Sequence, residues 1–302
     1  MKEKIFIPPL KIQGIKTKLL PIIKENVILN EDTIWIEPFM GSGVVGFNIA
    51  PKNAIFADVN PHIINFYNEI KEKKITSSIV RDFLKQEGEN LKEKGADYYY
   101  NVRERFNSTH NSLDFLFLNR SCFNGMMRFN KNYNFNVPFG HKIERFSKAY
   151  ITKIVNQVNF IETKLEFSNW KFLCQSFEKT ISEAAVNSFI YCDPPYIGRN
   201  VDYYDSWNEE LELKLYDELN KKDVKFMLST WDNNKYRKNE YIEKIWSSCN
   251  KITKEHFYFI GAKEENRNSI IEALLINYKI EKLLDRKNYE TEKNDSQLKL
   301  FE

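Results

Sequence analysis

Two short apolar runs, each ending near an acidic residue, constrain the fold of this chain more than any other feature. Residues 33–39 read TIWIEPF and residues 53–58 read NAIFAD, with a glycine-rich stretch over 41–46 between them. Runs of this length predict buried strands, and the glycines predict a tight turn into a helix. Pro61 then opens a further helix. This strand–helix–strand–helix order predicts an α/β fold with a parallel sheet.

The composition fits a folded globular chain and excludes several other classes. The 302 residues are 42% hydrophobic and 15% aromatic, which allows a sizeable core and excludes a disordered or collagen-like chain. No apolar run approaches the ~18 residues that span a bilayer, and Pro8 and Pro9 interrupt the apolar stretch near the start. The four cysteines lie far apart, without the spacing of a zinc site or a disulfide framework. We therefore expect a cytoplasmic protein with reduced cysteines and no metal.

Charge is balanced over the whole chain but not along it. Lysine and arginine number 45 against 42 acids, which gives a net charge of +3. Between residues 119 and 153, seven basic residues face a single acid, Glu144. Such a segment is typical of a surface that binds a polyanion, and a solvated face is the alternative.

Later apolar runs complete the expected sheet. Four further strands are expected, at residues 187–191, 224–230, 251–260 and 270–278. Residues 76–118 have a polar, helical pattern. The tract KNYN at 131–134 resembles a turn between two short aromatic strands.

The turn after the first strand is the first group of residues with a chemical meaning. It reads Glu37-Pro38-Phe39-Met40-Gly41-Ser42-Gly43, and Asp58 ends the second strand. Glycines let the backbone approach a ligand closely, and an acid at that strand end suits ribose hydroxyls. Glu37 would repel a pyrophosphate, so a ligand with a cationic amine fits better, and S-adenosylmethionine carries an amine and a sulfonium. An ordinary glycine-rich turn is the alternative.

The second such group, Asp193-Pro194-Pro195-Tyr196, follows the expected strand at 187–191. Two prolines make a stiff turn, and open α/β sheets bind ligands at the C-terminal ends of their strands. Asp193 and the Pro194 carbonyl could both accept hydrogen bonds from one NH₂ group, while the Tyr196 ring stacks on a planar base. Holding both protons favours a pyramidal nitrogen and frees its lone pair to attack a methyl sulfonium. A purely structural turn is the alternative.

In this order the two motifs resemble those of amino-methyltransferases that use S-adenosylmethionine. The chain is similar to the Dam-type DNA adenine methyltransferases over about residues 11 to 278. Three further segments carry this resemblance: the loop Gly14-Ile15-Lys16, the pair LNRSCFNGMMR (118–128) and FNVPFG (135–140), and Leu228-Ser229-Thr230 with its polar loop. Two departures are the Gly-Ile-Lys loop, where Gly-Gly-Lys is common, and Ser176, which stands where an acid is often found.

The resemblance implies an α/β fold with a Rossmann-like methyltransferase sheet, mostly parallel with an antiparallel edge. A target-recognition domain of helices and a β-hairpin is inserted into it. We expect the catalytic domain over residues 1–70 and 160–284, the insert over 71–159 and a flexible tail over 285–302.

The resemblance also implies roles for single residues. The implied cofactor-binding residues are Lys16, Glu37, Phe39, Gly41, Gly43, Asp58, Ser176 and Asp193. The implied catalytic residues, which hold a flipped adenine, are Asp193, Pro194, Pro195 and Tyr196. The implied DNA-binding residues are Arg120, Phe123, Asn124, Arg128 and Asn136. Among these, Arg128 reads a guanine through its O6 and N7 atoms, and Phe123 and Asn124 insert into the base stack.

The expected activity is methyl transfer from S-adenosylmethionine to the 6-amino group of a flipped adenine at specific sites in double-stranded DNA. Base flipping is needed because that amine is buried and paired within the duplex. The enzyme would belong to a prokaryotic or phage restriction-modification system, with the endonuclease on a separate chain, or act alone. Transfer to the 4-amino group of cytosine and a catalytically silent DNA-binding module are the alternatives. The recognition sequence and the oligomeric state stay open.

The C-terminal residues form a separate motif. Gln297, Leu298, Leu300 and Phe301 resemble the peptide by which bacterial replication and repair proteins dock on the sliding clamp. An extended tail presents such anchors well, and tethering would raise the local concentration of the enzyme at the replication fork. A frayed or packed terminus is the alternative.

Overall fold

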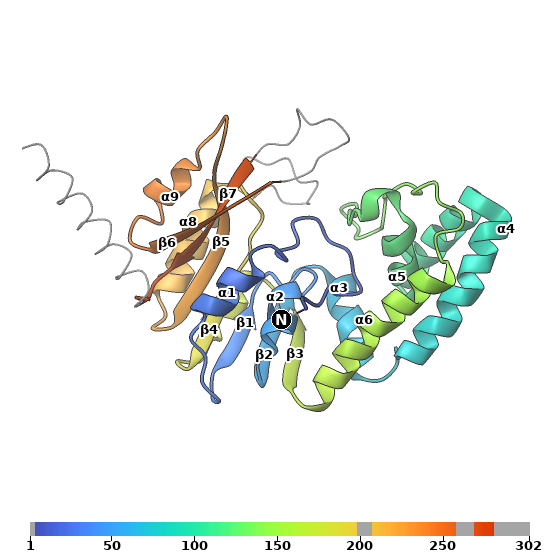
Figure 1. The fold of residues 1–302 in the computed structure, drawn as a ribbon, viewed down its shortest axis with the longest axis horizontal. Helices are drawn as coiled ribbons and strands as arrows, with labels where there is room; N and C mark the ends of the chain where they lie inside the picture. Colours follow the sequence, from blue (N-terminus) through green and yellow to red (C-terminus); the bar gives the residue numbers. More distant parts are fainter. Residues whose placement is uncertain (1–3, 198–206, 258–268, 281–302) are drawn as a thin grey trace, which may run out of the picture.

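The centre of the molecule is a seven-stranded sheet with the order β3-β2-β1-β4-β5-β7-β6 (Figure 1). The computed structural model describes residues 4–197, 207–257 and 269–280. Its strands are β1 (Ile34–Glu37), β2 (Asn53–Asp58), β3 (Asn169–Cys174), β4 (Ser188–Cys192), β5 (Lys225–Asn234), β6 (Asn250–Phe257) and β7 (Ser269–Ile276). The first five pair in parallel, whereas β7 pairs antiparallel with both β5 and β6. The expected sheet, mostly parallel with an antiparallel edge, is confirmed.

Helices cover both faces of this sheet. The helices of the sheet domain are α1 (Leu20–Asn26), α2 (Val44–Ile49), α3 (Pro61–Lys71), α7 (Phe177–Ser182), α8 (Glu209–Asn220) and α9 (Glu240–Lys244). Successive strand residues point to opposite faces, so Ile190 of β4 packs among residues of α7, α8 and α9, while Tyr191 packs on the side of α1, α2 and α3. The central strand β4 is buried along its whole length, as expected for a strand covered on both faces.

The helices α4 (Ser77–Thr109), α5 (Ser112–Ser121) and α6 (Lys148–Glu166) lie beside the sheet and form most of the insert (Figure 1). Helix α4 is interrupted at Gly95, whose φ of 62° is not helical. The expected domain boundary between residues 159 and 160 falls inside α6, which packs against α4 and then leads into β3. The helix therefore belongs to the insert and to the crossover into the sheet at once.

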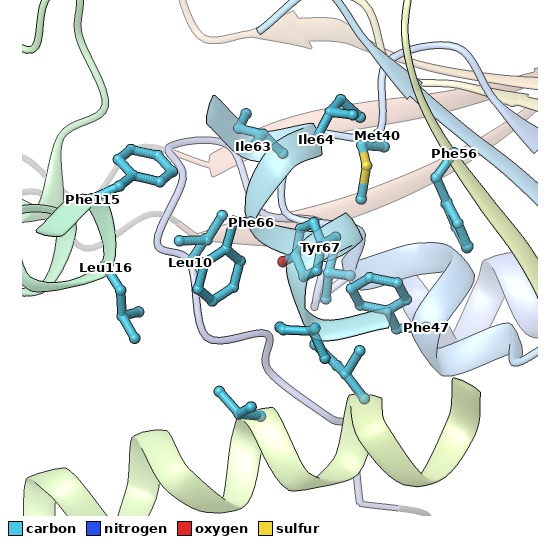
Figure 2. Packing of buried hydrophobic residues seen from close by; sticks show 14 of the residues in the cluster. Leu10, Met40, Phe47, Phe56, Ile63, Ile64, Phe66, Tyr67, Phe115 and Leu116 are labelled. Atoms are coloured by element: carbon cyan, nitrogen blue, oxygen red, sulfur yellow. The ribbon is translucent and has the colours of Figure 1, made fainter. Parts of the chain in front are cut away.

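The insert and the sheet share one hydrophobic core. Figure 2 shows Leu10 and Phe66 between residues near the sheet, such as Phe47, and insert residues Phe115 and Leu116. These side chains are all fully buried and belong to one continuous cluster. The insert is therefore fixed against the sheet by packing as well as by its two chain connections.

The segment around the tract KNYN at 131–134 forms a tight hairpin without a regular strand ladder. Isolated bridges join Phe129 to Phe135 and Cys122 to Phe139. The Asn130 side chain closes the turn by accepting hydrogen bonds from the backbone N–H groups of residues 132 and 134. Asparagine side chains that bond nearby backbone groups are typical of turns. We call residues 128–136 the recognition hairpin, after the DNA-reading role that the sequence resemblance implies for Arg128.

Some expectations lie outside the described residues. They are the tail at 285–302 with Gln297, Leu298, Leu300 and Phe301, and the last three residues of the strand expected at 251–260. In the described part of the chain, no helix combines the length and the apolar character needed to cross a membrane.

Candidate active site

A cleft of about 790 Å³ opens where β1, β2 and β4 end. The sequence-predicted residues that line it are Lys16, Glu37, Phe39, Gly41, Asp58, Arg128, Ser176, Asp193, Pro194, Pro195 and Tyr196. The C-terminal edge of a parallel sheet is where such folds bind ligands, because the strand ends and the following turns meet there. The structure thus brings the two separate sequence motifs together in one cavity.

Glycine conformation shapes the turn that closes one side of the cleft. Gly41 and Gly43 have φ angles of 48° and 74°, in the left-handed region that side chains with a Cβ rarely adopt. Gly43 does not line the cleft, but a Cβ on it would come within 2.6 Å of the Phe47 ring. Both glycines are therefore needed for the path of the backbone around the cavity.

Glu37 is a buried carboxylic acid at the end of β1. The residue is 2% exposed, and its Oε1 accepts a hydrogen bond of 2.9 Å from the Trp35 indole N–H. Burial raises the pKa of Glu37 to about 8, with a smaller contribution from the nearby Asp193. Such a group ionises readily when a cation enters the cleft beside it.

Asp58 connects the end of β2 to the glycine turn. Its Oδ2 accepts from the Gly41 N–H and its Oδ1 from the Asn60 N–H, both at 2.9 Å. Burial raises the pKa of this carboxyl group, and the backbone hydrogen bonds counteract the shift. Each carboxylate oxygen carries two lone pairs, so both oxygens keep the capacity to accept from ligand hydroxyls.

The Asp193 carboxylate is held on one side only. Its Oδ1 receives the Lys16 ammonium at 2.8 Å and the Ser229 hydroxyl at 2.7 Å. Lys16 is 5% exposed and also donates to the Gly14 carbonyl. Within the described part of the chain, Oδ2 of Asp193 makes no hydrogen bond or ion pair. The carboxylate is therefore oriented by the protein and keeps one oxygen for a substrate amine.

Tyr196 forms the opposite side of this turn. The Lys16 Nζ lies 5.1 Å from its ring centroid, and its hydroxyl donates to Glu272 on β7 at 3.3 Å. These contacts hold the ring in the lining of the cleft, where an aromatic face can stack on a base.

Sequence reasoning missed an aromatic wall of the cleft. Phe39 packs between Phe177, at 5.3 Å, and Trp207, at 5.4 Å between ring centroids. The Trp207 indole N–H donates to Glu212 at 2.5 Å, and Glu212 also accepts from Trp246. Three rings around one part of the cavity suit a planar heterocycle. An aromatic residue soon after the Asp-Pro-Pro-Tyr turn was the available sequence clue to Trp207.

The predicted DNA-binding residues occupy three different environments. Arg128 lines the cleft and donates from Nε to the Asn136 side chain at 2.9 Å across the recognition hairpin. Phe123 is 45% exposed, and Asn124 beside it has a φ of 53° in the same exposed turn. In contrast, Arg120 is 2% exposed and donates to Gln157 on α6.

The burial of Arg120 corrects its expected role as a direct DNA contact. Its helix α5 is enclosed on several sides, so that nine of its ten residues are buried. Arg120 Nη1 lies 3.4 Å from the Tyr150 hydroxyl, and Arg145 Nε donates to the Arg120 carbonyl at 2.8 Å. Arg120 therefore supports other side chains from below the surface.

A doubly covered sheet with a glycine turn after β1 and an Asp-Pro-Pro-Tyr turn after β4 defines a Rossmann-like methyltransferase that acts on an amino group. Residues 13–260 match the family model of the D12 class of N6 adenine-specific DNA methyltransferases. The chain belongs to this family, and its activity is therefore the methylation of adenine in DNA.

Curated relatives agree with this assignment. The chain is 33% identical to the type II methyltransferase M.MjaIII of Methanocaldococcus jannaschii, over 90% of this chain and 99% of that protein. It is 36% identical to a DNA adenine methylase of Serratia marcescens, over 62% of this chain and 66% of that protein. It is 30% identical to the type II methyltransferase M.FokI of Planomicrobium okeanokoites, over 89% of this chain but 42% of that protein.

Proposed function

We propose that the enzyme transfers a methyl group from S-adenosylmethionine to the 6-amino group of an adenine flipped out of double-stranded DNA. The observation that carries this proposal is the half-occupied Asp193 carboxylate. Lys16 and Ser229 hold its Oδ1, while Oδ2 remains for the amine. The Tyr196 ring lies on the same turn, where it can stack on the base.

The residues of the cleft fit this cofactor. Glu37 supplies a buried carboxylate for an amine cation, and Asp58 supplies two acceptor oxygens for ribose hydroxyls. The wall of Phe39, Phe177 and Trp207 suits an adenine ring. Ser176 caps α7 through its side chain at the same side of the cleft. When bound, S-adenosylmethionine supplies a methyl group on a positively charged sulfur.

The protein's part in the reaction is to prepare the amine and remove a proton. Asp193 and the Pro194 carbonyl accept hydrogen bonds from the two N–H groups of the adenine 6-amino group. This arrangement turns the nitrogen lone pair toward the methyl group. S-adenosylmethionine, held in the cleft by residues such as Glu37 and Asp58, would supply the methyl group to this lone pair, and its sulfur would keep the electrons of the broken sulfur–carbon bond. The nitrogen then loses one proton, which Asp193 accepts and passes to water. Exclusion of water by the aromatic wall strengthens these polar contacts.

A group of cations where the N-terminal loop meets the insert supports binding of a DNA backbone. The Arg145 guanidinium lies 4.8 Å, and the Lys11 ammonium 6.0 Å, from the ring centroid of Tyr150, and Arg120 lies beneath. Burial raises the pKa of the Tyr150 hydroxyl, but the three cations together lower it. Among the described residues, no carboxylate pairs with any of the three cations. A phosphate group would supply the missing negative charge. We call these four residues the Tyr150 cation cluster.

The position of this cluster also fits a complex with flipped DNA. Lys11 packs against Gly125, where an added Cβ would come within 2.6 Å of the lysine Cδ. Gly125 ends the turn that presents Phe123 and Asn124. Phosphate contacts beside an inserting aromatic residue would hold the duplex while the base leaves the stack, which costs a few kcal/mol.

The test of the proposed chemistry is the Asp193→Ala variant. We expect cofactor-dependent transfer of a tritiated methyl group to DNA to disappear, while binding of S-adenosylmethionine by titration calorimetry is largely retained. Normal turnover by this variant would remove Asp193 from the mechanism. A wild-type protein that methylates cytosine at its 4-amino group would favour the first alternative, and tight DNA binding without any transfer would favour the silent module.

The names of the relatives bear on the biological setting. M.MjaIII and M.FokI are named as type II methyltransferases, whereas the Serratia marcescens relative is named a DNA adenine methylase. We propose a restriction-modification role with a separate cognate endonuclease, and a solitary role is the second candidate. DNA as the substrate implies a cytoplasmic enzyme at the nucleoid.

The sliding clamp remains a proposed partner through Gln297, Leu298, Leu300 and Phe301. Deletion of residues 296–302 should abolish capture by immobilised clamp and leave methylation of short duplexes unchanged. Equal capture of the shortened and the full-length chain would rule this partner out.

A further inference from the structure

His62 is a buried side chain that joins the sheet domain to the recognition hairpin. It lies in the first turn of α3, is 3% exposed, and its Nε2 lies 2.9 Å from the Tyr133 carbonyl oxygen. Its ring stacks on Phe129 of the hairpin at 5.0 Å between centroids and meets the edge of Phe106 at 4.9 Å. One histidine thus contacts the hairpin through a hydrogen bond and a ring face.

The surroundings of the imidazole fix its protonation and its direction of bonding. A carbonyl oxygen only accepts, so Nε2 must carry the proton. Burial, with His110 close by, lowers the pKa of His62, and the hydrogen bond to Tyr133 counteracts this shift. Nδ1 is buried and has no hydrogen-bond partner among the described residues. The neutral ring with a proton on Nε2 is therefore the form that fits.

The same turn of α3 leads directly to the cofactor side of the cleft. Asn60 caps the helix by accepting the His62 backbone N–H at 3.0 Å, and its own N–H donates to Asp58. Asp58 in turn accepts from Gly41 in the glycine turn. His62 is thus attached to the rigid framework around the cofactor.

On its other side, the hairpin carries the arginine expected to read DNA. Arg128 is bonded to Asn136 across the hairpin and lines the cleft. The insert also anchors the hairpin, because the Asn107 side chain makes two hydrogen bonds to the backbone of Phe135. The distance of Arg128 from the flipped base depends on how the hairpin is held from both sides.

We infer that His62 is a positioning residue for DNA sequence discrimination, which sets the recognition hairpin against the methyl-transfer cleft without touching DNA. This inference rests on the proposed function. A recognition arginine discriminates between bases only when its geometry is held to a fraction of an ångström. The His62 hydrogen bond fixes the hairpin to the turn of α3 that is bonded to Asp58, on the cofactor side of the cleft.

Two matched variants test the inference. His62→Phe keeps a ring on Phe129 but has no donor, whereas His62→Gln places an amide N–H near the position of Nε2. The measurement is kcat/KM on duplexes with the recognition sequence, as defined from methylated host DNA, and on duplexes with one base pair replaced. Arg128→Ala serves as the reference for lost discrimination. Binding of S-adenosylmethionine and the melting temperature are measured alongside.

We expect His62→Phe to lower the ratio of cognate to mismatched kcat/KM by about tenfold, in keeping with the loss of one buried hydrogen bond. The loss should fall at the base pair that Arg128→Ala affects. His62→Gln should retain most of the discrimination, and both variants should bind S-adenosylmethionine as the wild type does.

Wild-type discrimination in His62→Phe would overturn the inference, as would an equal loss of cofactor binding in both variants. If His62→Phe does not fold, His62→Asn replaces it, because the shorter amide cannot reach the Tyr133 carbonyl. A wild-type enzyme that methylates no DNA would instead contradict the proposed function, so the two failures are distinguishable.

Discussion

Two carboxylic acids line the cleft in different environments, and the difference suggests that they have different roles. Asp193 is oriented by Lys16 and Ser229, which both bind its Oδ1, and it lines the cleft. Glu37 is enclosed, and burial raises its pKa to about 8. Different environments often separate the roles of acids within one active site. We infer that Asp193 serves the amine that is methylated and Glu37 serves the cationic cofactor.

The pH dependence of cofactor binding tests the role of Glu37. The free carboxyl group is mostly neutral below its pKa of about 8, and a cation beside it favours the ionised form, so binding releases a proton. The dissociation constant for S-adenosylmethionine should therefore decrease as pH rises from about 6 to 7.5, by up to about tenfold per pH unit. Glu37→Gln should flatten this dependence. Calorimetry in buffers of different ionisation enthalpy would count the proton.

The same group should lower the stability of the free protein as pH rises. The ordinary pKa of an exposed glutamate carboxyl is 4.5, whereas burial raises the pKa of Glu37 to about 8 in the folded protein, so the unfolded chain loses this proton first as pH rises. The stabilisation from the neutral form is complete below 4.5 and is lost by about 8. Glu37→Gln should remove this contribution. An unchanged dependence of binding or of stability on pH in that variant would contradict the role of Glu37.

At the scale of elements, close packing of α2 against β1 and β2 holds the glycine turn. A Cβ on Gly46 would come within 2.3 Å of the Phe56 ring and 2.7 Å of the Glu37 Oε1. Gly46→Ala should lower the free energy of unfolding by about 1–3 kcal/mol, and it should also weaken cofactor binding. Thermal unfolding and calorimetry measure the two effects.

The matched control for this variant lies in the insert. A Cβ on Gly88 of α4 would meet the Phe146 Cβ at 2.8 Å, in a place remote from the glycine turn. Gly88→Ala should lower stability to a similar degree and leave cofactor binding unchanged. If both variants bound the cofactor as the wild type does, α2 would not be what positions Glu37.

A second prediction at this scale concerns the Tyr150 cation cluster, which lies between the N-terminal loop and α6. Arg145→Gln should weaken DNA binding about equally on cognate and unrelated sequences, because phosphates carry no base information. In a plot of the logarithm of the DNA-binding constant against the logarithm of salt concentration, the magnitude of the negative slope should decrease by about 1. Lys171→Gln, on the exposed side of β3, removes the same charge and should leave the slope unchanged. Identical slopes for wild type and Arg145→Gln would exclude this cluster as a phosphate site.

The sequence predicted elements well where a single pattern decides them. The strands ending at Glu37, Asp58 and Cys192 were predictable because each apolar run stops at an acid or directly before one. The position of the domain boundary relative to α6 was not predictable, because an amphipathic helix that packs on both α4 and α3 shows one continuous hydrophobic pattern. The burial of Arg120 was also hidden, since net charge along a segment says nothing about enclosure by helices distant in sequence.

For the candidate site too, residues were predictable from sequence where one local motif contains them. Motif residues such as Asp193 were predictable because adjacent residues carry the chemistry. Trp207 and His62 were not, because their importance comes from partners such as Glu212 and Tyr133 that tertiary structure brings to them. Contacts between distant segments are the part that a single sequence does not encode in a readable pattern.

At the scale of the whole molecule, one core links the catalytic sheet to the insert. Leu10, Phe66 and Phe115 pack within the same cluster (Figure 2), and the cleft is lined from both parts, by Asp193 on one side and Arg128 on the other. The proposed base recognition by Arg128 and the methyl transfer would therefore take place on parts of the chain that share one core. We propose that this geometry is the basis on which the enzyme selects one adenine in one short sequence.

The most direct measurement is long-read sequencing of host DNA after expression of the chain in a strain without DNA methylation. The proposed mechanism predicts 6-methyladenine at one fixed position of one short motif, and no modification in cells that express Asp193→Ala at the same level. Modified cytosine, or unmodified DNA in cells that contain soluble, folded wild-type protein, would contradict it.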